Sequence, residues 1–188
     1  MQTTLHPKAC RQCSREFMPA RPLQAVCSPR CAERKGRADK AAAKAADRAL
    51  TRKRREAIKT IADRIAEAQV AFNAYIRLRD MHLGCIDCGK PFEPQKPGGS
   101  IDAGHYRSRG AAPGLRFHED NVFAQRKNCN RPGGATAADF RAGVVARIGE
   151  ERVRAVECDN TVHKWTHDEL IEIRARYIGK RKALEAAA

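Results

Sequence analysis

The sequence has no long apolar run and few aromatic residues. None of its hydrophobic stretches approaches the roughly 20 residues that a membrane-spanning helix requires, so we expect no membrane-embedded segment. Aromatic residues make up 5% of the 188 residues, and much of the 42% hydrophobic content is alanine. This composition argues against a single large core, and small domains with thin cores are commonly stabilised by metal ions or disulfides.

Acidic residues are also scarce, because 37 lysines and arginines face only 22 aspartates and glutamates, a formal net charge of +15. An excess of this size implies a polyanionic partner, either nucleic acid or an acidic membrane surface. Residues Met1 to Lys8 lack the apolar segment of a secretory signal. We therefore expect a reducing compartment, in which closely spaced cysteines are metal ligands rather than disulfides.

Four of the eight cysteines form two close pairs near the N-terminus. Cys10 and Cys13 are separated by 13 residues from Cys27, which is followed by Cys31. Such pairs are typical of a tetrahedral site in which four thiolates hold a structural zinc ion. The alternative is four free, buried thiols. Ser28 and Pro29 are expected to cap and begin a helix directly after the second pair.

Residues 33–82 are rich in strong helix formers. Between Glu33 and Lys59 stand eleven basic and four acidic residues with no apolar stripe. A helix of this kind is either solvated or bound to a polyanion. We expect its phosphate contacts to include Arg52, Lys53, Arg54 and Arg55.

Amphipathic patterns recur on both sides of a central segment rich in Gly, Pro, Cys and His. One apolar stripe begins at Ile61, and another helix is expected from Phe140 to Glu157. Thr166 and Glu169 have the spacing of a capping box before a last helix. We divide the chain into a zinc module (1–32), a long helix (33–82), a central core (83–136) and a C-terminal helical region (137–188).

The central segment contains a second cysteine pair, Cys85 and Cys88, with Cys129 downstream. A closed site would need a fourth ligand, but Arg126 occupies the position where a second pair would begin. His118 or Cys158 are candidate fourth ligands. A three-cysteine site completed by water and a segment without zinc are the alternatives.

Polar residues in this segment follow the order of an HNH nuclease. His105 is expected on one strand and Asn121 at the end of a second strand, followed by the pair Cys129-Asn130 at the start of a helix. A histidine in such a site deprotonates water, an asparagine holds its ring, and a divalent metal stabilises the developing charge. The pattern predicts a ββα-metal core with His105 as general base.

The chain resembles the NinG family of lambdoid phages, also called Rap, over nearly its whole length. The resemblance rests on the N-terminal cysteine module, the basic helix and several motifs. These motifs are Ala71-Phe72-Asn73-Ala74-Tyr75-Ile76-Arg77, Cys85-Ile86-x-Cys88-Gly89, Asp102-Ala103-Gly104-His105-Tyr106-Arg107, Ala111-Ala112-Pro113-x-Leu115-Arg116-Phe117, Arg147-Ile148-Gly149 and Lys164-Trp165-Thr166.

The resemblance implies a recombination endonuclease that cuts branched DNA in the cytoplasm of the bacterial host. Three departures fall in the stretch that should carry the partner knuckle of Cys85 and Cys88 and the start of the following helix. Phe123 stands where the family has a histidine, Arg126 replaces a cysteine, and Gly133 to Thr136 replace Lys-Ser-Gly-Asn. In addition, Gly104 precedes the candidate base, where HNH sites often have an aspartate.

We therefore expect an α+β protein with an N-terminal zinc knuckle, a long basic helix, a small HNH-like core and C-terminal helices. A catalytic Mg²⁺ or Mn²⁺ would be held by Asn130 and, less favourably, by Asp102, because residues three apart on a strand face opposite sides. Arg107, Arg109 and Arg116 are candidate phosphate contacts. The alternative is a zinc-containing DNA-binding protein that has lost cleavage. An RNA-binding protein lacks support, since no RRM-like aromatic motif is present.

Overall fold

The computed structural model describes residues 5–93 and 100–187, which fall into two compact units, Met1–Ile58 and Lys59–Ala188. Both helices and strands are present, in agreement with the predicted α+β class: five α-helices and two small antiparallel sheets lie in the described part of the chain.

The helix that we expected over residues 33–82 is two helices. The first, α1, covers Pro29–Ala57, and the second, α2, covers Ile61–Arg79. Thr60 accounts for the start of α2, because its hydroxyl accepts a hydrogen bond from the backbone N–H of Asp63 and the Asp63 carboxylate accepts one from the backbone N–H of Thr60. This capping box satisfies backbone groups that a continuous helix would have paired internally.

The first unit consists of a small hairpin and α1. Strand β1 (Lys8–Ala9) pairs with β2 (Glu16–Phe17). Helix α1 begins as expected, with the Ser28 hydroxyl accepting a hydrogen bond from the backbone N–H of Cys31. Cys31 is the only buried residue of α1. The rest of this helix therefore contributes nothing to a hydrophobic core and presents its side chains to solvent.

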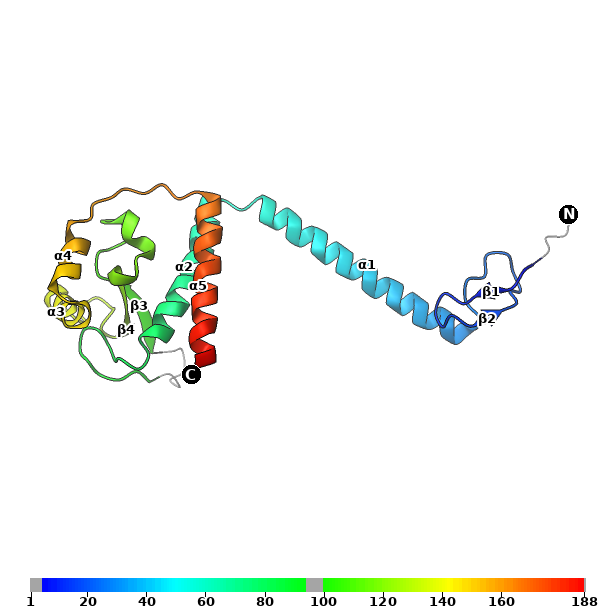
Figure 1. Ribbon diagram of the computed structural model, residues 1–188, viewed down its shortest axis with the longest axis horizontal. Coiled ribbons are helices and arrows are strands. Elements are labelled where there is room, and N and C mark those ends of the chain that lie inside the picture. Colours follow the sequence, from blue (N-terminus) through cyan, green and yellow to red (C-terminus); the bar gives the residue numbers. More distant parts are fainter. Residues whose placement is uncertain (1–4, 94–99, 188) are drawn as a thin grey trace. The chain divides into compact units, whose positions relative to one another are not determined.

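In the second unit, a two-stranded hairpin lies between two pairs of helices (Figure 1). Strand β3 (Ile101–His105) pairs with β4 (Val122–Arg126), with His105 opposite Val122. The strands are joined through two 3-10 helices, η1 (Pro113–Phe117) and η2 (Glu119–Asn121).

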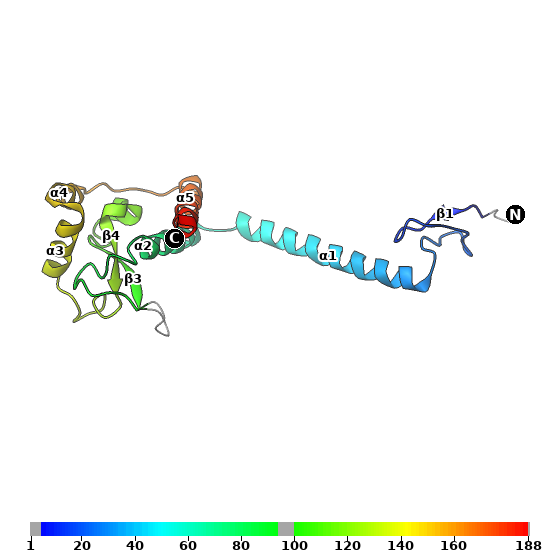
Figure 2. The ribbon, with the colours of Figure 1, turned by 60° about the horizontal axis from the view of Figure 1, so that its bottom comes forward.

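Helix α2 runs alongside α5 (His167–Ala187) on one side of the hairpin, as both views show (Figures 1 and 2). Their contact is aromatic, since the rings of Phe72 and Tyr177 meet edge to face with centroids 4.6 Å apart. Phe117 and Val122 join this core from the hairpin region. The predicted capping box before α5 is confirmed, because the Thr166 backbone N–H donates to Glu169, 2.8 Å away.

Helices α3 (Ala137–Ile148) and α4 (Glu150–Cys158) cover the other side of the hairpin. They replace the single helix that we predicted from Phe140 to Glu157. Gly149 separates them with a positive φ of 84°, a conformation that favours glycine. Val144 is buried against Phe123 in this second core.

Candidate functional site

The four N-terminal cysteines come together as their spacing predicted. Their sulfur atoms all lie within 4.8 Å of one another. The Sγ atom of Cys27 lies 3.7 Å from that of Cys13 and 3.6 Å from that of Cys31. Zn–S bonds of about 2.3 Å at tetrahedral angles place sulfur atoms roughly 3.8 Å apart. The cluster is therefore suited to hold a metal ion such as zinc.

The thiol of Cys10 is poised for metal binding. Burial raises its pKa, but backbone N–H groups of Cys27, Gln12 and Cys13 outweigh this effect and bring the pKa down to about 6. The thiolate is the form that coordinates metals. Four cysteines would fill a tetrahedral coordination shell, which is the arrangement of a structural rather than a catalytic zinc site.

The central cysteines form a second cluster with three members, Cys85, Cys88 and Cys129. The Sγ atoms of Cys88 and Cys129 are 3.6 Å apart. Neither of the candidate fourth ligands, His118 and Cys158, belongs to this cluster.

Arg126 stands beside the three central cysteines without acting as a metal ligand. Its backbone N–H donates to the Cys85 sulfur, 3.2 Å away, and its guanidinium pairs with Glu93 at 3.0 Å. The three cysteine sulfur atoms are suited to hold a metal ion whose fourth ligand does not come from this cluster.

His105 ends strand β3 with a defined ring orientation. Its Nε2 atom lies 3.0 Å from the backbone carbonyl of Arg116. A carbonyl oxygen only accepts hydrogen bonds, so Nε2 carries the proton and the neutral ring keeps its lone pair on Nδ1.

The electrostatic surroundings of His105 favour the same neutral state. Burial lowers the pKa of His105 below its ordinary 6.5, and the nearby charges of Arg109 and Arg116 lower it further, against the hydrogen bond with the Arg116 carbonyl. A neutral imidazole with a free lone pair is the form in which a general base acts.

Asn121 ends η2 and directly precedes β4, so it does not end a strand as predicted. It also does not hold the His105 ring directly, contrary to our expectation. Its side chain is fully buried and binds backbone groups: Oδ1 accepts from the Arg107 N–H at 2.7 Å, and Nδ2 donates to the carbonyls of Arg107 and Leu115. Asn121 thus fixes the segment that leads from β3 to η1. Its backbone carbonyl also accepts a hydrogen bond from the N–H of Tyr106, the residue after His105.

Asn130 lies in a turn after β4, and the following helix α3 begins only at Ala137. This differs from the predicted helix start at Cys129-Asn130, and the glycines at 133 and 134 are the physical reason for the delay. The Asn130 amide nevertheless meets Asp102, to whose Oδ2 atom it donates at 3.2 Å. These two candidate metal ligands are therefore neighbours.

A hollow of about 270 Å³ lies beside these residues. Its lining includes His105 and Asn130, together with Asp87 and Gln125, which the sequence analysis missed. No local pattern could have joined Asp87 and Gln125, because 38 positions separate them along the chain.

The three candidate phosphate-binding arginines of this region have different roles. Arg107 is not free to bind phosphate, because its guanidinium donates to the backbone carbonyls of Val156, Glu157 and Asp159 at the end of α4. Arg109 is exposed and has no hydrogen-bond or ion-pair partner among the described residues. Arg116 is half-buried, and burial and the charge of Arg109 lower its pKa. The last two form a positive surface next to His105.

The remaining candidate DNA contacts, Arg52 to Arg55, lie near the end of α1. All four side chains are exposed. They belong to the unit Met1–Ile58 and form part of its solvent-facing basic helix.

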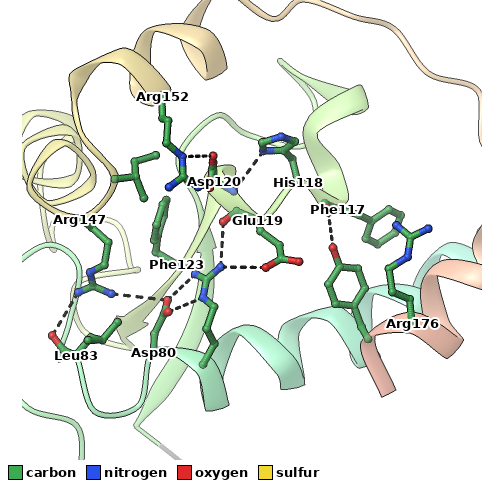
Figure 3. A pocket seen from close by; sticks show the side chains of 13 residues that line it. Asp80, Leu83, Phe117, His118, Glu119, Asp120, Phe123, Arg147, Arg152 and Arg176 are labelled. Carbon is green, nitrogen blue, oxygen red and sulfur yellow. Dashed lines mark hydrogen bonds and ion pairs between the residues drawn. The ribbon is translucent and has the colours of Figure 1, made fainter. Parts of the chain in front are cut away.

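A larger hollow of about 650 Å³ is lined by residues of α2, η2, α3, α4 and α5 (Figure 3). Arginine and carboxylate side chains dominate its walls. Arg152 reaches Asp120 with an Nε–Oδ2 distance of 2.8 Å, and Arg79 binds Asp80 with an Nε–Oδ1 distance of 2.6 Å. Arg176 has no hydrogen-bond or ion-pair partner among the described residues.

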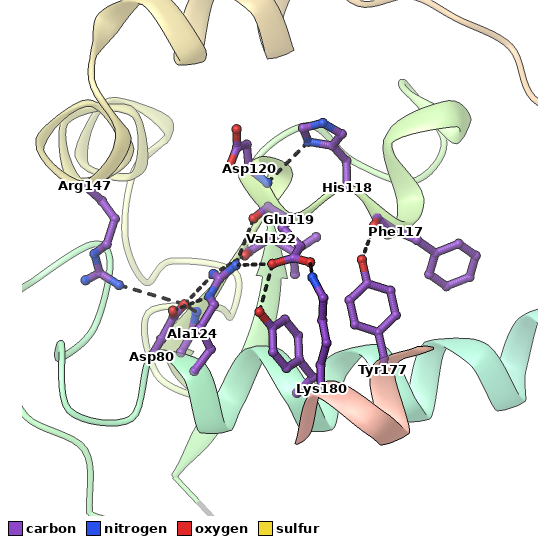
Figure 4. Close-up of polar contacts among 12 residues, drawn as sticks. Asp80, Phe117, His118, Glu119, Asp120, Val122, Ala124, Arg147, Tyr177 and Lys180 are labelled. Atoms are coloured by element: carbon purple, nitrogen blue, oxygen red, sulfur yellow. Dashed lines mark hydrogen bonds and ion pairs between the residues drawn. The ribbon is translucent and has the colours of Figure 1, made fainter. Parts of the chain in front are cut away.

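The polar network in this hollow supports strand β4 (Figure 4). Buried Asp80 accepts a hydrogen bond from the backbone N–H of Ala124, and Arg79 donates to the carbonyl of Val122. Glu119 accepts from Tyr75 and Lys180. Burial raises the pKa of Glu119, but its bonds to Lys180 and Tyr75 outweigh this and keep it ionised. The network therefore supplies hydrogen bonds to backbone groups on the edge of β4 that does not pair with β3.

Within the described residues, no helix combines the length and apolar character needed to cross a membrane.

Comparison with known proteins identifies the relatives of the chain. A family model described as "Bacteriophage Lambda NinG protein" matches residues 2–187. The chain is 37% identical to Protein ninG of Escherichia phage lambda over 190 residues, covering 92% of this chain and 90% of that protein. Protein ninG of Salmonella phage P22 is also 37% identical, with the same coverage. Protein ninG of Escherichia phage 933W is 42% identical over 120 residues, covering 64% of this chain and 57% of that protein. No solved structure matches the chain.

Proposed function

The chain belongs to the bacteriophage lambda NinG protein family, and we propose that it is a metal-dependent endonuclease that acts on branched DNA in the bacterial host. The observation that carries this proposal is the state of His105. Burial lowers its pKa and so favours the neutral ring, its Nε2 lies 3.0 Å from the Arg116 carbonyl, and its Nδ1 has no hydrogen-bond partner among the described residues. Preference for branched DNA rests on the family resemblance alone.

In the proposed mechanism, Nδ1 of His105 removes a proton from a water molecule that attacks a DNA phosphate. Asn121 keeps the Arg107–Leu115 segment in place and so keeps the ring fixed. The exposed Arg109 and the half-buried Arg116 hold the phosphate beside the ring. A bound Mg²⁺ or Mn²⁺ would supply stabilisation of the developing negative charge. Asp102 and Asn130 offer oxygen ligands suited to such a hard cation.

The basic helix α1 and the four-cysteine module supply affinity rather than chemistry in this proposal. Exposed lysines and arginines on α1 would contact phosphates without reading sequence. Zinc in the N-terminal cluster would fix the fold of the first unit, because four thiolates leave no open coordination position for a substrate.

A non-catalytic DNA-binding protein is the second candidate, and two residues favour it. Phe123 has a side chain without polar atoms, and it is buried against Phe140. It therefore offers no ligand to a metal ion. Arg126 pairs with Glu93 instead of binding metal. Neither residue removes the free Nδ1 of His105, which is why the nuclease is the preferred function.

The test is a nicking assay on branched and linear duplexes of equal length, with Mg²⁺ or Mn²⁺ and with a chelator. The His105→Ala variant should bind DNA with nearly unchanged affinity but cleave roughly 10²–10⁴-fold more slowly, the usual contribution of a general base. Wild-type protein that binds both DNAs but nicks neither in any divalent metal would refute the nuclease and favour the DNA-binding alternative.

A further inference from the structure

The hairpin residue that precedes His105 leaves a space that another side chain fills. Gly104 lies opposite Phe123 in the β3–β4 ladder. A Cβ atom built on Gly104 would lie 1.5 Å from the Oε1 atom of Gln125 and 2.4 Å from its Cδ atom. The Gln125 amide therefore occupies the position where any longer residue at 104 would begin its side chain.

Gln125 is an unusual buried amide. It is only 3% exposed, and its Oε1 atom has no hydrogen-bond partner among the described residues. Its Nε2 atom donates to both carboxylate oxygens of Asp87, at 3.0 Å and 2.9 Å. Gly104 leaves room for the Gln125 amide, and this amide fixes the orientation of the Asp87 carboxylate.

Asp87 and Asp102 both belong to this oxygen-rich region. Asp102 lies opposite Gln125 in the ladder and binds the Asn130 amide, while Asp87 binds Gln125 itself. Asp87, Gln125 and Asn130 all line the hollow that His105 borders. Carboxylate and amide oxygens are the ligands that Mg²⁺ and Mn²⁺ prefer.

We propose that Asp87, oriented by Gln125, is a carboxylate ligand of a divalent cation in the His105 hollow, in the place of the acidic residue that Gly104 does not provide. The inference rests on the proposed function for the role of the cation, but cation binding itself is independent of cleavage. Asp87 would act as the ligand, and Gln125 as a positioning residue that acts through Asp87.

Asp87 also lies close to the central cysteines, because its Oδ2 atom is 3.5 Å from the Cys85 sulfur. It is not within 4.8 Å of all three sulfur atoms, and so it is not part of their cluster as the side chain now stands. A test must therefore separate loss of the divalent cation from loss of zinc.

The experiment titrates the full-length, zinc-loaded protein with Mn²⁺ and follows free Mn²⁺ by electron paramagnetic resonance. Asp87→Asn should weaken Mn²⁺ binding by at least about tenfold, since affinity for hard cations depends on ligand charge. Gln125→Met, which keeps the volume but removes the amide, should weaken binding by about tenfold, the usual effect of losing a residue that orients a ligand. Asp168→Asn removes a carboxylate from the first turn of α5 and should leave Mn²⁺ affinity unchanged.

Zinc content and DNA nicking are measured on the same samples. Unchanged Mn²⁺ affinity in Asp87→Asn would overturn the inference, even if the wild type nicks DNA. Loss of zinc in Asp87→Asn would also overturn it, because Asp87 would then serve the cysteine cluster. Binding of Mn²⁺ that depends on Asp87, in a protein that never nicks DNA, would support the inference and refute the proposed nuclease.

Discussion

At the scale of single residues, the candidate site depends on hydrogen bonds that decide protonation and orientation. The Arg116 carbonyl selects the tautomer of His105, and nearby arginine charges disfavour its protonation. A base whose pKa lies below 6.5 is weaker than a free histidine, but a larger fraction of it is deprotonated at neutral pH. Arg109 and Arg116 thus have two effects, since the charges that would attract phosphate also keep the base neutral.

This arrangement predicts the pH dependence of cleavage. The lowered pKa of His105 means that the ring loses its proton below pH 6.5, so the cleavage rate should rise with pH and level off below that value. Arg109→Gln removes one of the charges that lower the pKa of His105, so the rise of the cleavage rate should move to higher pH. Rates measured at saturating DNA and fixed metal concentration between pH 5 and 8 test this. A rise at the same pH in the Arg109→Gln variant would contradict the prediction.

Asn121 should affect stability as well as cleavage. Asn121→Ala would remove the partner of the half-buried N–H and carbonyl of Arg107. It would also remove one of two hydrogen bonds to the Leu115 carbonyl, which keeps the one from the His118 N–H. An unsatisfied buried group costs about 1–3 kcal/mol, so the two Arg107 groups should lower the free energy of unfolding by a few kcal/mol. Urea denaturation measures this loss. His105→Ala is the comparison, because it should slow cleavage with a much smaller change in stability.

At the scale of elements, the two cysteine clusters differ by one ligand. The N-terminal cluster has four cysteines and the central cluster has three, with Arg126 beside them. We expect about one tightly held zinc per chain, lost in a Cys10→Ser, Cys13→Ser double variant. Arg126→Cys should add a second tightly held zinc. Zinc measured after dialysis against a weak chelator tests both changes, and a wild type that retains two zinc ions would show that three cysteines suffice.

These clusters also illustrate how far the sequence predicts the structure. The N-terminal ligands were predictable because each cysteine pair is local, and the predicted capping box at Thr166 likewise involves residues three apart. The capping box at Thr60 has the same spacing but was not predicted, because it lies inside a stretch of strong helix formers. The break at Gly149, where φ is 84°, was not predicted, because one glycine costs a helix only about 1 kcal/mol and does not by itself end it. The roles of Arg107 and Asp87 depend on residues 38 or more positions away, which no periodicity reveals.

Helix α1 should determine the salt dependence of DNA binding. Its exposed basic residues would release counterions, with a log–log slope of about −0.9 for each phosphate neutralised on duplex DNA. Reversal of Arg52, Lys53, Arg54 and Arg55 to glutamate should flatten the slope measured by fluorescence anisotropy between low and moderate salt. Circular dichroism must show that the helix persists. An unchanged slope would mean that other surfaces neutralise the phosphates.

At the scale of the whole molecule, the elements to which we assign DNA binding and cleavage lie in two different compact units. The unit Met1–Ile58 contains the four-cysteine cluster and the solvent-facing basic helix, and the unit Lys59–Ala188 contains His105 with its own hydrophobic cores. Since each unit has its own stabilising elements, the proposed chemistry should not require the first unit to be folded. The first unit should instead raise the concentration of DNA at the second.

A fragment of residues 59–188 tests this division of tasks. It contains both cores, the β3–β4 hairpin and the His105 hollow, so it should unfold cooperatively on heating. Cleavage at saturating DNA should be close to that of the full chain, because the proposed general base and cation ligands are all present. The KM for DNA should rise strongly and depend less on salt, since the phosphate contacts of α1 are missing. A folded fragment with an unchanged KM would place the DNA-binding surface in the second unit. A folded fragment that binds DNA but has lost cleavage at saturation would show that the first unit contributes to the chemistry itself.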